Sequence, residues 1–96
     1  MIEGKINIIL NYFKAGNFKY VIKETTKLSN KNPNNSYLKN LLGLAYLETG
    51  AKIQAVENFN LAIKLNPKNI SALNNLGNAY KYLNKYEKAE KFYLRA

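Results

Sequence analysis

The sequence predicts an all-α fold built from repeated pairs of helices. Matching residues recur 34 positions apart, as Gly43 and Gly77 do, and as Pro33 and Pro67 do. Between these markers, apolar residues recur every three or four positions, which is the spacing of an amphipathic helix. Alternation of apolar and polar residues, the pattern of a strand, does not occur along the chain. These three observations favour stacked helical hairpins over any fold that contains a sheet.

The repeat interval divides one domain, residues 1–96, into three units. They cover residues 2–35, 36–69 and 70–96, and the last unit is incomplete. The same interval separates several further pairs: Gly16 and Gly50, Ala45 and Ala79, Tyr46 and Tyr80, Ala55 and Ala89, Phe59 and Tyr93, and Ala62 and Ala96. Because glycine, alanine and aromatic residues each return at their own place, we expect the units to share one packing scheme.

Each unit is expected to contain two helices. In the first, the pattern predicts helices over residues 2–14 and 18–31, with a turn around Gly16. In the second, Ser36 is the predicted N-cap, and residues 49–51 interrupt the periodicity. The next run begins near Ile53 and stops at Asn66-Pro67, because a residue before proline disfavours helical geometry.

The third unit repeats this arrangement. Asn69 is the predicted N-cap of its first helix, whose apolar residues run from Leu73 to Leu83. Asn84 is followed three residues later by Glu87, which resembles a capping box and predicts the start of a second helix.

A family resemblance follows from the second unit. The residues that carry it are Leu42-Gly43, Tyr46, Gly50, Ala55, Phe59, Ala62 and Pro67. They resemble one full tetratricopeptide repeat, whose length is 34 residues, and the third unit repeats the pattern. The resemblance implies a right-handed superhelical solenoid of antiparallel helix pairs, with about three repeats and six helices. Lys39 and Leu73 stand where the family often has tryptophan.

The first unit departs from the pattern and is interpreted as a degenerate N-terminal repeat. Ile9 replaces the small residue at which the two helices of a pair approach, and Val21 replaces its small partner. Thr25 stands in place of the aromatic residue. Terminal repeats of solenoids are often atypical.

Composition argues against catalysis. The chain has no Cys and no His, so it has neither a zinc site of those ligands nor a Ser-His-Asp triad. Its acidic residues are glutamates scattered over the three units, and no glycine-rich phosphate loop is present. We therefore expect no enzyme activity, no metal and no cofactor. Apolar runs are far shorter than the roughly 20 residues of a membrane span, and no signal peptide is apparent, which predicts a cytoplasmic protein.

The net charge of +9 suggests nucleic-acid binding as an alternative. Lys19, Lys23 and Lys27 form one basic strip, and residues 81–91 carry another. However, the charge is spread over all three units, and lysines on an outer helix face are usually solvated. Nucleic acid is therefore the second alternative, behind a protein partner.

The family resemblance also implies where a partner binds. Ligands of this family usually lie in a concave groove lined by the first helix of each pair. The resemblance implies these partner-binding residues: Tyr37, Asn40, Leu44, Leu47, Asn74, Asn78, Lys81 and Tyr82. The wider groove adds Glu3, Ile6, Leu10, Phe13, Lys14, Glu48 and Ser71.

The asparagines suggest a mechanism, because an amide offers both a donor and an acceptor to a peptide backbone. The hypothesis is an extended peptide held by Asn40, Asn74 and Asn78. The competing interpretation is that these are solvent-facing asparagines in an asparagine-rich chain.

One ligand class of the family is not expected. Its chaperone-binding members grip a terminal carboxylate with lysine, asparagine and arginine side chains. The aligned positions here carry Ile6, Leu10, Leu41, Ser71 and Asn75, so that clamp is absent.

The sequence therefore predicts a protein–protein interaction module that binds a protein or peptide in the groove. The first alternative is a homo-oligomerising scaffold, which would self-associate through the groove or the uncapped C-terminal end. Leu83, Phe92 and Tyr93 lie near that end. The absence of a polar capping helix there favours a piece of a longer protein.

Overall fold

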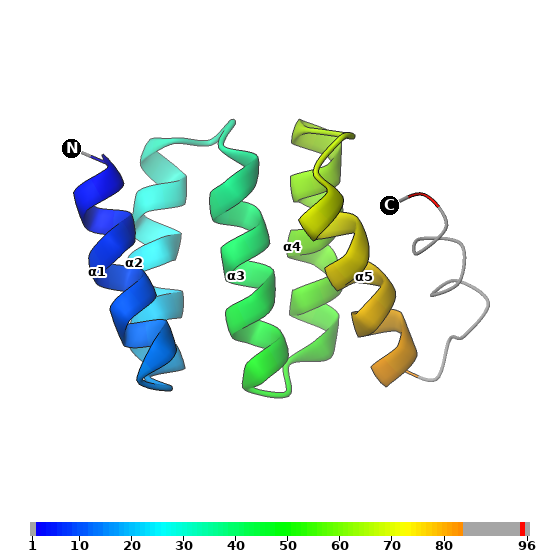
Figure 1. Cartoon of the computed structure of the whole chain (residues 1–96), viewed down its shortest axis with the longest axis horizontal. Helices are drawn as coiled ribbons and strands as arrows, with labels where there is room; N and C mark the ends of the chain where they lie inside the picture. Colours follow the sequence, from blue (N-terminus) through cyan, green and yellow to red (C-terminus); the bar gives the residue numbers. More distant parts are fainter. Residues whose placement is uncertain (1, 84–94, 96) are drawn as a thin grey trace.

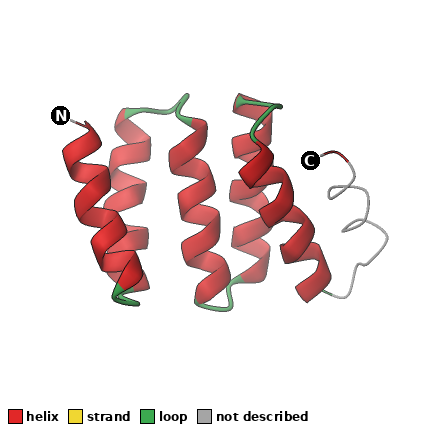
Figure 2. Cartoon of the chain, viewed as in Figure 1, coloured by secondary structure: helices red, strands yellow, loops and turns green. Residues whose placement is uncertain are grey.

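Five helices stand side by side in the computed structural model, which describes residues 2–83 and residue 95 (Figure 1). They are α1 (Ile2–Lys14), α2 (Phe18–Lys31), α3 (Ser36–Glu48), α4 (Lys52–Leu65) and α5 (Ile70–Tyr82). Figure 2 shows only helices and short loops over these residues, and none of them forms a strand. The all-α prediction is confirmed. The sixth expected helix, with its capping box at Asn84 and Glu87, falls outside the described residues.

The helices pack in chain order, as a solenoid requires. α1 packs on α2 and α3 packs on α4, which forms the two complete helix pairs. α2 also packs on α3, and α4 on α5, so each pair contacts the next one along the row (Figure 1). The result is an elongated body of 39 × 24 × 18 Å. Contacts of this nearest-neighbour kind are the source of stability in repeat proteins.

Glycine makes the turn inside each complete pair. Gly16 lies between α1 and α2 with φ of 78°, and Gly50 lies between α3 and α4 with φ of 84°. A side chain raises the energy of this left-handed backbone, whereas glycine adopts it freely. The recurrence of glycine at these two positions therefore reflects one turn geometry used twice.

Asparagines cap three of the helices. The side chains of Asn17, Asn35 and Asn69 each accept a hydrogen bond from the backbone N–H three residues later. The prediction for Asn69 is confirmed, whereas the prediction for Ser36 is wrong. Asn35 caps α3 instead, and the Ser36 hydroxyl donates to the carbonyl of Ala62 in α4 at 2.7 Å. Ser36 therefore ties α3 to its neighbour.

The closest approach between helices occurs at Gly43. A Cβ atom built on this glycine would lie under 3.0 Å from the ring of Phe59, which comes from α4 and is fully buried. The expectation that Gly43 marks the approach of α3 and α4 is confirmed. In the first pair, Ile9 stands in the place of Gly43 and Thr25 in the place of Phe59, and α1 and α2 contact each other less extensively than α3 and α4 do.

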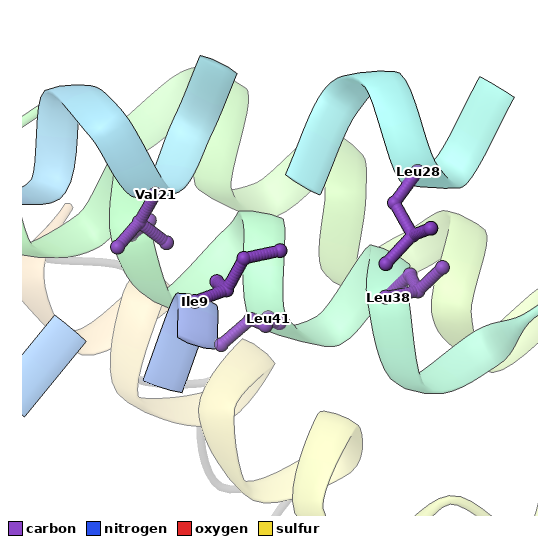
Figure 3. Packing of buried hydrophobic residues seen from close by; sticks show 6 residues of the cluster. Ile9, Val21, Leu28, Leu38 and Leu41 are labelled. Carbon is purple, nitrogen blue, oxygen red and sulfur yellow. The ribbon is translucent and has the colours of Figure 1, made fainter. Parts of the chain in front are cut away.

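Two hydrophobic clusters lie between successive helices. The first joins α1, α2 and α3, and Figure 3 shows its side chains meeting across these helices: Ile9, Val21, Leu28, Leu38 and Leu41. The second joins α4 and α5 through Ala55, Phe59, Leu76 and Ala79. Burial of these residues fixes the relative positions of α1, α3 and α5, which are the first helices of the three units.

Candidate functional site

A pocket lies among the first helices of the three units. It has a volume of about 230 Å³ and is lined by Leu10, Phe13, Tyr37, Asn40, Leu41, Leu44 and Ser71. We refer to it as the first-helix pocket. Sites for small molecules usually begin at about 300 Å³. The first-helix pocket is smaller, so it fits one side chain of a partner better than a cofactor.

The lining of the first-helix pocket is mainly apolar, and no charged side chain contributes to it. Leu10 and Phe13 of α1 are half-buried and pack against the first core cluster, while Leu44 packs against the second. Tyr37 is 47% exposed. Apolar surface left in water is a source of binding free energy when a partner covers it.

Asn40 is the main polar group of the pocket, and it is only 6% exposed. Its Nδ2 donates to Ser71 Oγ at 3.1 Å, and its Oδ1 accepts from Asn75 Nδ2 at 3.0 Å. The structure thus differs from both sequence-based interpretations of Asn40, which assumed an accessible or solvent-facing amide. Asn40 bridges α3 and α5, because two polar residues of α5 meet it there. An amide has two N–H groups and two acceptor lone pairs, so one of each is not used by these bonds.

A second polar link joins the same two units. Asn69 Nδ2 donates to Ser36 Oγ at 2.9 Å, and Ser36 in turn donates to the Ala62 carbonyl. Together with the bonds of Asn40, this link fixes α5 against α3 and α4 by side chains as well as by apolar packing. These side-chain links hold the wall of the first-helix pocket in place without a ligand, so the pocket is preformed.

The structure brings together part of the predicted groove. Of the partner-binding candidates, Tyr37, Asn40 and Leu44 line the first-helix pocket, as do Leu10, Phe13 and Ser71 of the wider groove. Leu47 packs against the second core cluster. The remaining candidates lie outside the pocket lining and are exposed: Asn74, Asn78, Lys81 and Tyr82. That all eight contact a partner stays a prediction.

Sequence reasoning missed the part played by Leu41. The sequence places it in the apolar run of this helix and at a position of the absent clamp, but not in the groove; it lines the first-helix pocket while also belonging to the first core cluster. The signal was present in its spacing. Leu41 lies four residues after Tyr37 and three before Leu44, so the three share one face of α3.

In the part of the chain that the structure describes, no three His, Cys, Asp or Glu side chains gather as metal ligands. None of the described helices combines the length and apolar character needed to cross a bilayer.

Two family models match the chain, both described as the tetratricopeptide repeat. They cover residues 37–69 and residues 70–96. A search of curated proteins finds no match. The first unit, at residues 2–35, therefore lies outside both matched ranges.

Solved structures extend the similarity over nearly the whole chain. The first tetratricopeptide-repeat domain of Spaghetti (RPAP3), bound to the HSP90 peptide SRMEEVD, is 31% identical with a TM-score of 0.90. That match covers 93% of this chain and 71% of the other. The second such domain of the same protein, bound to the same peptide, has a TM-score of 0.91 at 22% identity and covers 96% and 85%.

MamA from Desulfovibrio magneticus has the same fold over a longer chain. Its TM-score is 0.90 at 19% identity, and the match covers 95% of this chain and 51% of MamA. The chain thus spans about half the length of that solved piece of MamA. At this level of identity the likeness concerns the fold alone.

Proposed function

Because the chain belongs to the tetratricopeptide-repeat family, we propose that it is a protein-interaction module that holds a peptide segment of its partner in the first-helix pocket. The observation that carries the proposal is the pocket itself. It is mainly apolar, it is uncharged, and helices of three successive units form it. A preformed site avoids the entropic cost of ordering the binding surface when the partner arrives.

The lining favours an apolar side chain as the anchor of the bound segment. Leu10, Phe13 and Leu44 supply apolar surface. Asn40 has one N–H and one acceptor lone pair that its bonds to Ser71 and Asn75 do not use, and these suit a peptide backbone. An anchor of this kind follows the usual pattern, in which a few polar groups orient a mostly apolar contact.

The proposed ligand differs from the peptide bound by the two RPAP3 domains. The positions aligned with the carboxylate clamp hold mostly apolar residues, and Leu10 and Leu41 among them line the pocket instead. We therefore expect the chain to bind SRMEEVD no better than a scrambled peptide of the same composition, since no clamp receives the terminal carboxylate.

The proposal is tested by selecting peptides from a random display library on the unchanged chain. Enriched peptides should share an apolar residue, and their affinity should fall about tenfold or more in a Tyr37→Glu variant, which places a charge beside the pocket. Leu61→Glu is the matched control, because Leu61 is 43% exposed on α4 and lines neither this pocket nor a core cluster. Equal losses in both variants, or enrichment of acidic peptides without an apolar residue, would contradict the proposal.

A further inference from the structure

A second pocket lies between α1 and α2, and it shares no residue with the first-helix pocket. Its volume is also about 230 Å³. The apolar part of its lining comes from Ile8, Ile9, Tyr20 and Leu28, and the charged part from Lys5, Glu24, Lys27 and Lys31. We refer to it as the N-terminal hairpin pocket, because α1 and α2 form the N-terminal end of the row (Figure 1).

The exposure of Ile8 sets this end of the row apart from the interior. Ile8 is 52% exposed, whereas the residues at the same place in the next two units, Leu42 and Leu76, are 4% and 0% exposed. In the inner units the neighbouring helices cover this position. At Ile8, no described helix does so, and a large apolar side chain remains open to a partner.

The other α1 residues at the positions that pack between units are unsuited to contact with a further repeat. In the second unit, Leu38, Leu41 and Ala45 are buried, and Leu38 and Leu41 are packed against α2 residues of the same cluster. The equivalent residues of α1 are Gly4, Asn7 and Asn11, and all three are exposed. A further helix of the repeat type would lose most of its apolar contact here. The opening is therefore limited to the pocket around Ile8, which suits a short segment.

The charge around the pocket indicates what such a segment carries. Three lysines contribute to the lining against one glutamate, and that glutamate is already paired, since Glu24 lies 3.5 Å from Lys27. Lys5 and Lys31 are exposed. A second copy of this chain, with its own net charge of +9, is repelled by such a surface, whereas a segment with carboxylates is attracted.

We propose that the N-terminal hairpin pocket binds a short acidic segment of a partner protein, with one apolar side chain on Ile8 and flanking carboxylates near Lys5 and Lys31. The chain then has two separate binding surfaces of different chemistry. On the proposed function, the first-helix pocket takes an apolar anchor side chain of a peptide, and the hairpin pocket takes an apolar residue within an acidic segment.

The test uses a fluorescein-labelled peptide in which a single leucine is flanked on both sides by glutamates, titrated with the full chain by fluorescence anisotropy. We expect saturable binding that weakens about tenfold in Ile8→Asn, in which burial of the apolar side chain is lost. The double variant Lys5→Glu, Lys31→Glu should weaken binding by a similar factor, and added salt should weaken binding to the unchanged chain. Replacing the leucine of the peptide by serine, or its glutamates by glutamine, should have the matching effects.

Two control variants separate this site from general attraction to a basic chain. Ile53 on α4 is 65% exposed, and Lys68 lies in the loop before α5; neither lines the pocket. Ile53→Asn and Lys68→Glu should leave the affinity unchanged, as should Tyr37→Glu in the first-helix pocket. Circular dichroism of each variant establishes that it is folded.

Several results would overturn the proposal. They are absence of saturable binding to the folded chain, weakening by Lys68→Glu equal to that by the double variant Lys5→Glu, Lys31→Glu, and loss of binding in Tyr37→Glu. A dimer seen by light scattering that Ile8→Asn dissociates, together with no peptide binding, would assign the pocket to a second copy and contradict the proposed partner. Loss of binding in Tyr37→Glu would place this peptide in the first-helix pocket instead; the other outcomes do not depend on what binds there.

Discussion

At Gly43 the absence of a side chain lets the ring of Phe59 lie against the backbone of α3. Phe59 is fully buried and joins α4 to α5 in the second core cluster. The missing side chain on α3 therefore leaves space for a ring that belongs to α4 and packs against α5. A substitution at Gly43 therefore affects the packing of all three helices.

We expect Gly43→Ala to destabilise the protein. Overpacking of this kind typically costs about 1–3 kcal/mol, which exceeds the gain of about 1 kcal/mol from the higher helix propensity of alanine. Urea denaturation measures the change. Gly4→Ala is the control, because a Cβ there meets nothing within 4 Å, so it should be neutral or stabilising. Equal effects of the two substitutions would contradict the close approach.

Thr25 presents the opposite case, a polar group with nothing to bond. Its side chain is fully buried in α2, and its hydroxyl has no hydrogen-bond partner among the residues described. Burying an unpaired hydroxyl costs about 1–3 kcal/mol in proteins. Thr25 stands where the second unit has Phe59, so this position of the first unit is polar where the repeat pattern is apolar.

Thr25→Val should therefore stabilise the protein by about 1 kcal/mol, since valine keeps the shape and removes the hydroxyl. For a domain of this size that corresponds to a rise in melting temperature of about 4–8 °C. Thr26→Val, at the next and only half-buried position of α2, is the matched control. If both variants melt at the temperature of the unchanged protein, the hydroxyl of Thr25 carries no such penalty.

At the scale of the helices, the contact between α3 and α5 depends on Asn40. It receives a hydrogen bond from Asn75 and gives one to Ser71, and both of those residues belong to α5. Asn74 occupies the same place in the next unit, yet it is exposed. Two residues that the repeat pattern treats as equal thus differ in environment.

Asn40→Ala should destabilise the protein by about 2 kcal/mol, because it removes two side-chain hydrogen bonds between α3 and α5 and leaves the half-buried amide of Asn75 without its acceptor. Asn74→Ala should change the stability by no more than about 0.5 kcal/mol, as is usual at the surface. Thermal or chemical denaturation of both variants gives the comparison. Similar losses at the two positions would show that Asn40 is not a special bridge between α3 and α5.

The helices themselves could be predicted from the sequence, because they depend on local patterns. The bounds of α1 and α2, the cap at Asn69 and the glycine turns all follow from the periodicity, the capping chemistry and the 34-residue interval. The cap of α3 was misplaced by one residue, because Asn35 and Ser36 are both good capping residues and the hydroxyl of Ser36 bonds to α4 instead.

The candidate site could be predicted only in part. The family resemblance placed Tyr37, Leu44, Leu10 and Phe13 in the groove of the first helices, and all four line the first-helix pocket. They could not show that Asn40 is buried, because the groups that cover it come from a helix about 30 residues later. Long-range contacts of this kind depend on how individual residues of different units pack together. A repeat pattern records only what the units have in common, so it does not contain this information.

On the scale of the whole molecule, the net charge of +9 is spread along the sequence over all three units, and most of the second basic strip, at residues 81–91, lies outside the described residues. The side chains of Lys19, Lys23 and Lys27 are exposed on α2, and Lys27 is paired with Glu24. We expect binding to duplex DNA to be weak and to fall steeply with salt, as for non-specific attraction.

A filter-binding assay over a range of salt concentrations tests this expectation. Lys19→Glu and Lys68→Glu should reduce any binding equally, because the attraction comes from total charge and not from a particular strip. Binding that persists at physiological salt and depends on Lys19 alone would instead support a nucleic-acid site on α2.

The central claim is that three successive first helices enclose a preformed pocket for an apolar side chain of a protein partner. The most direct measurement is an isotope-filtered NMR experiment on the chain with a peptide selected from the display library. We predict contacts from the apolar side chain of the peptide to the methyl groups and rings of Leu10, Phe13 and Leu44, with no rearrangement of the helices. Contacts confined to the outer face of α2, or a pocket that forms only on binding, would contradict this account.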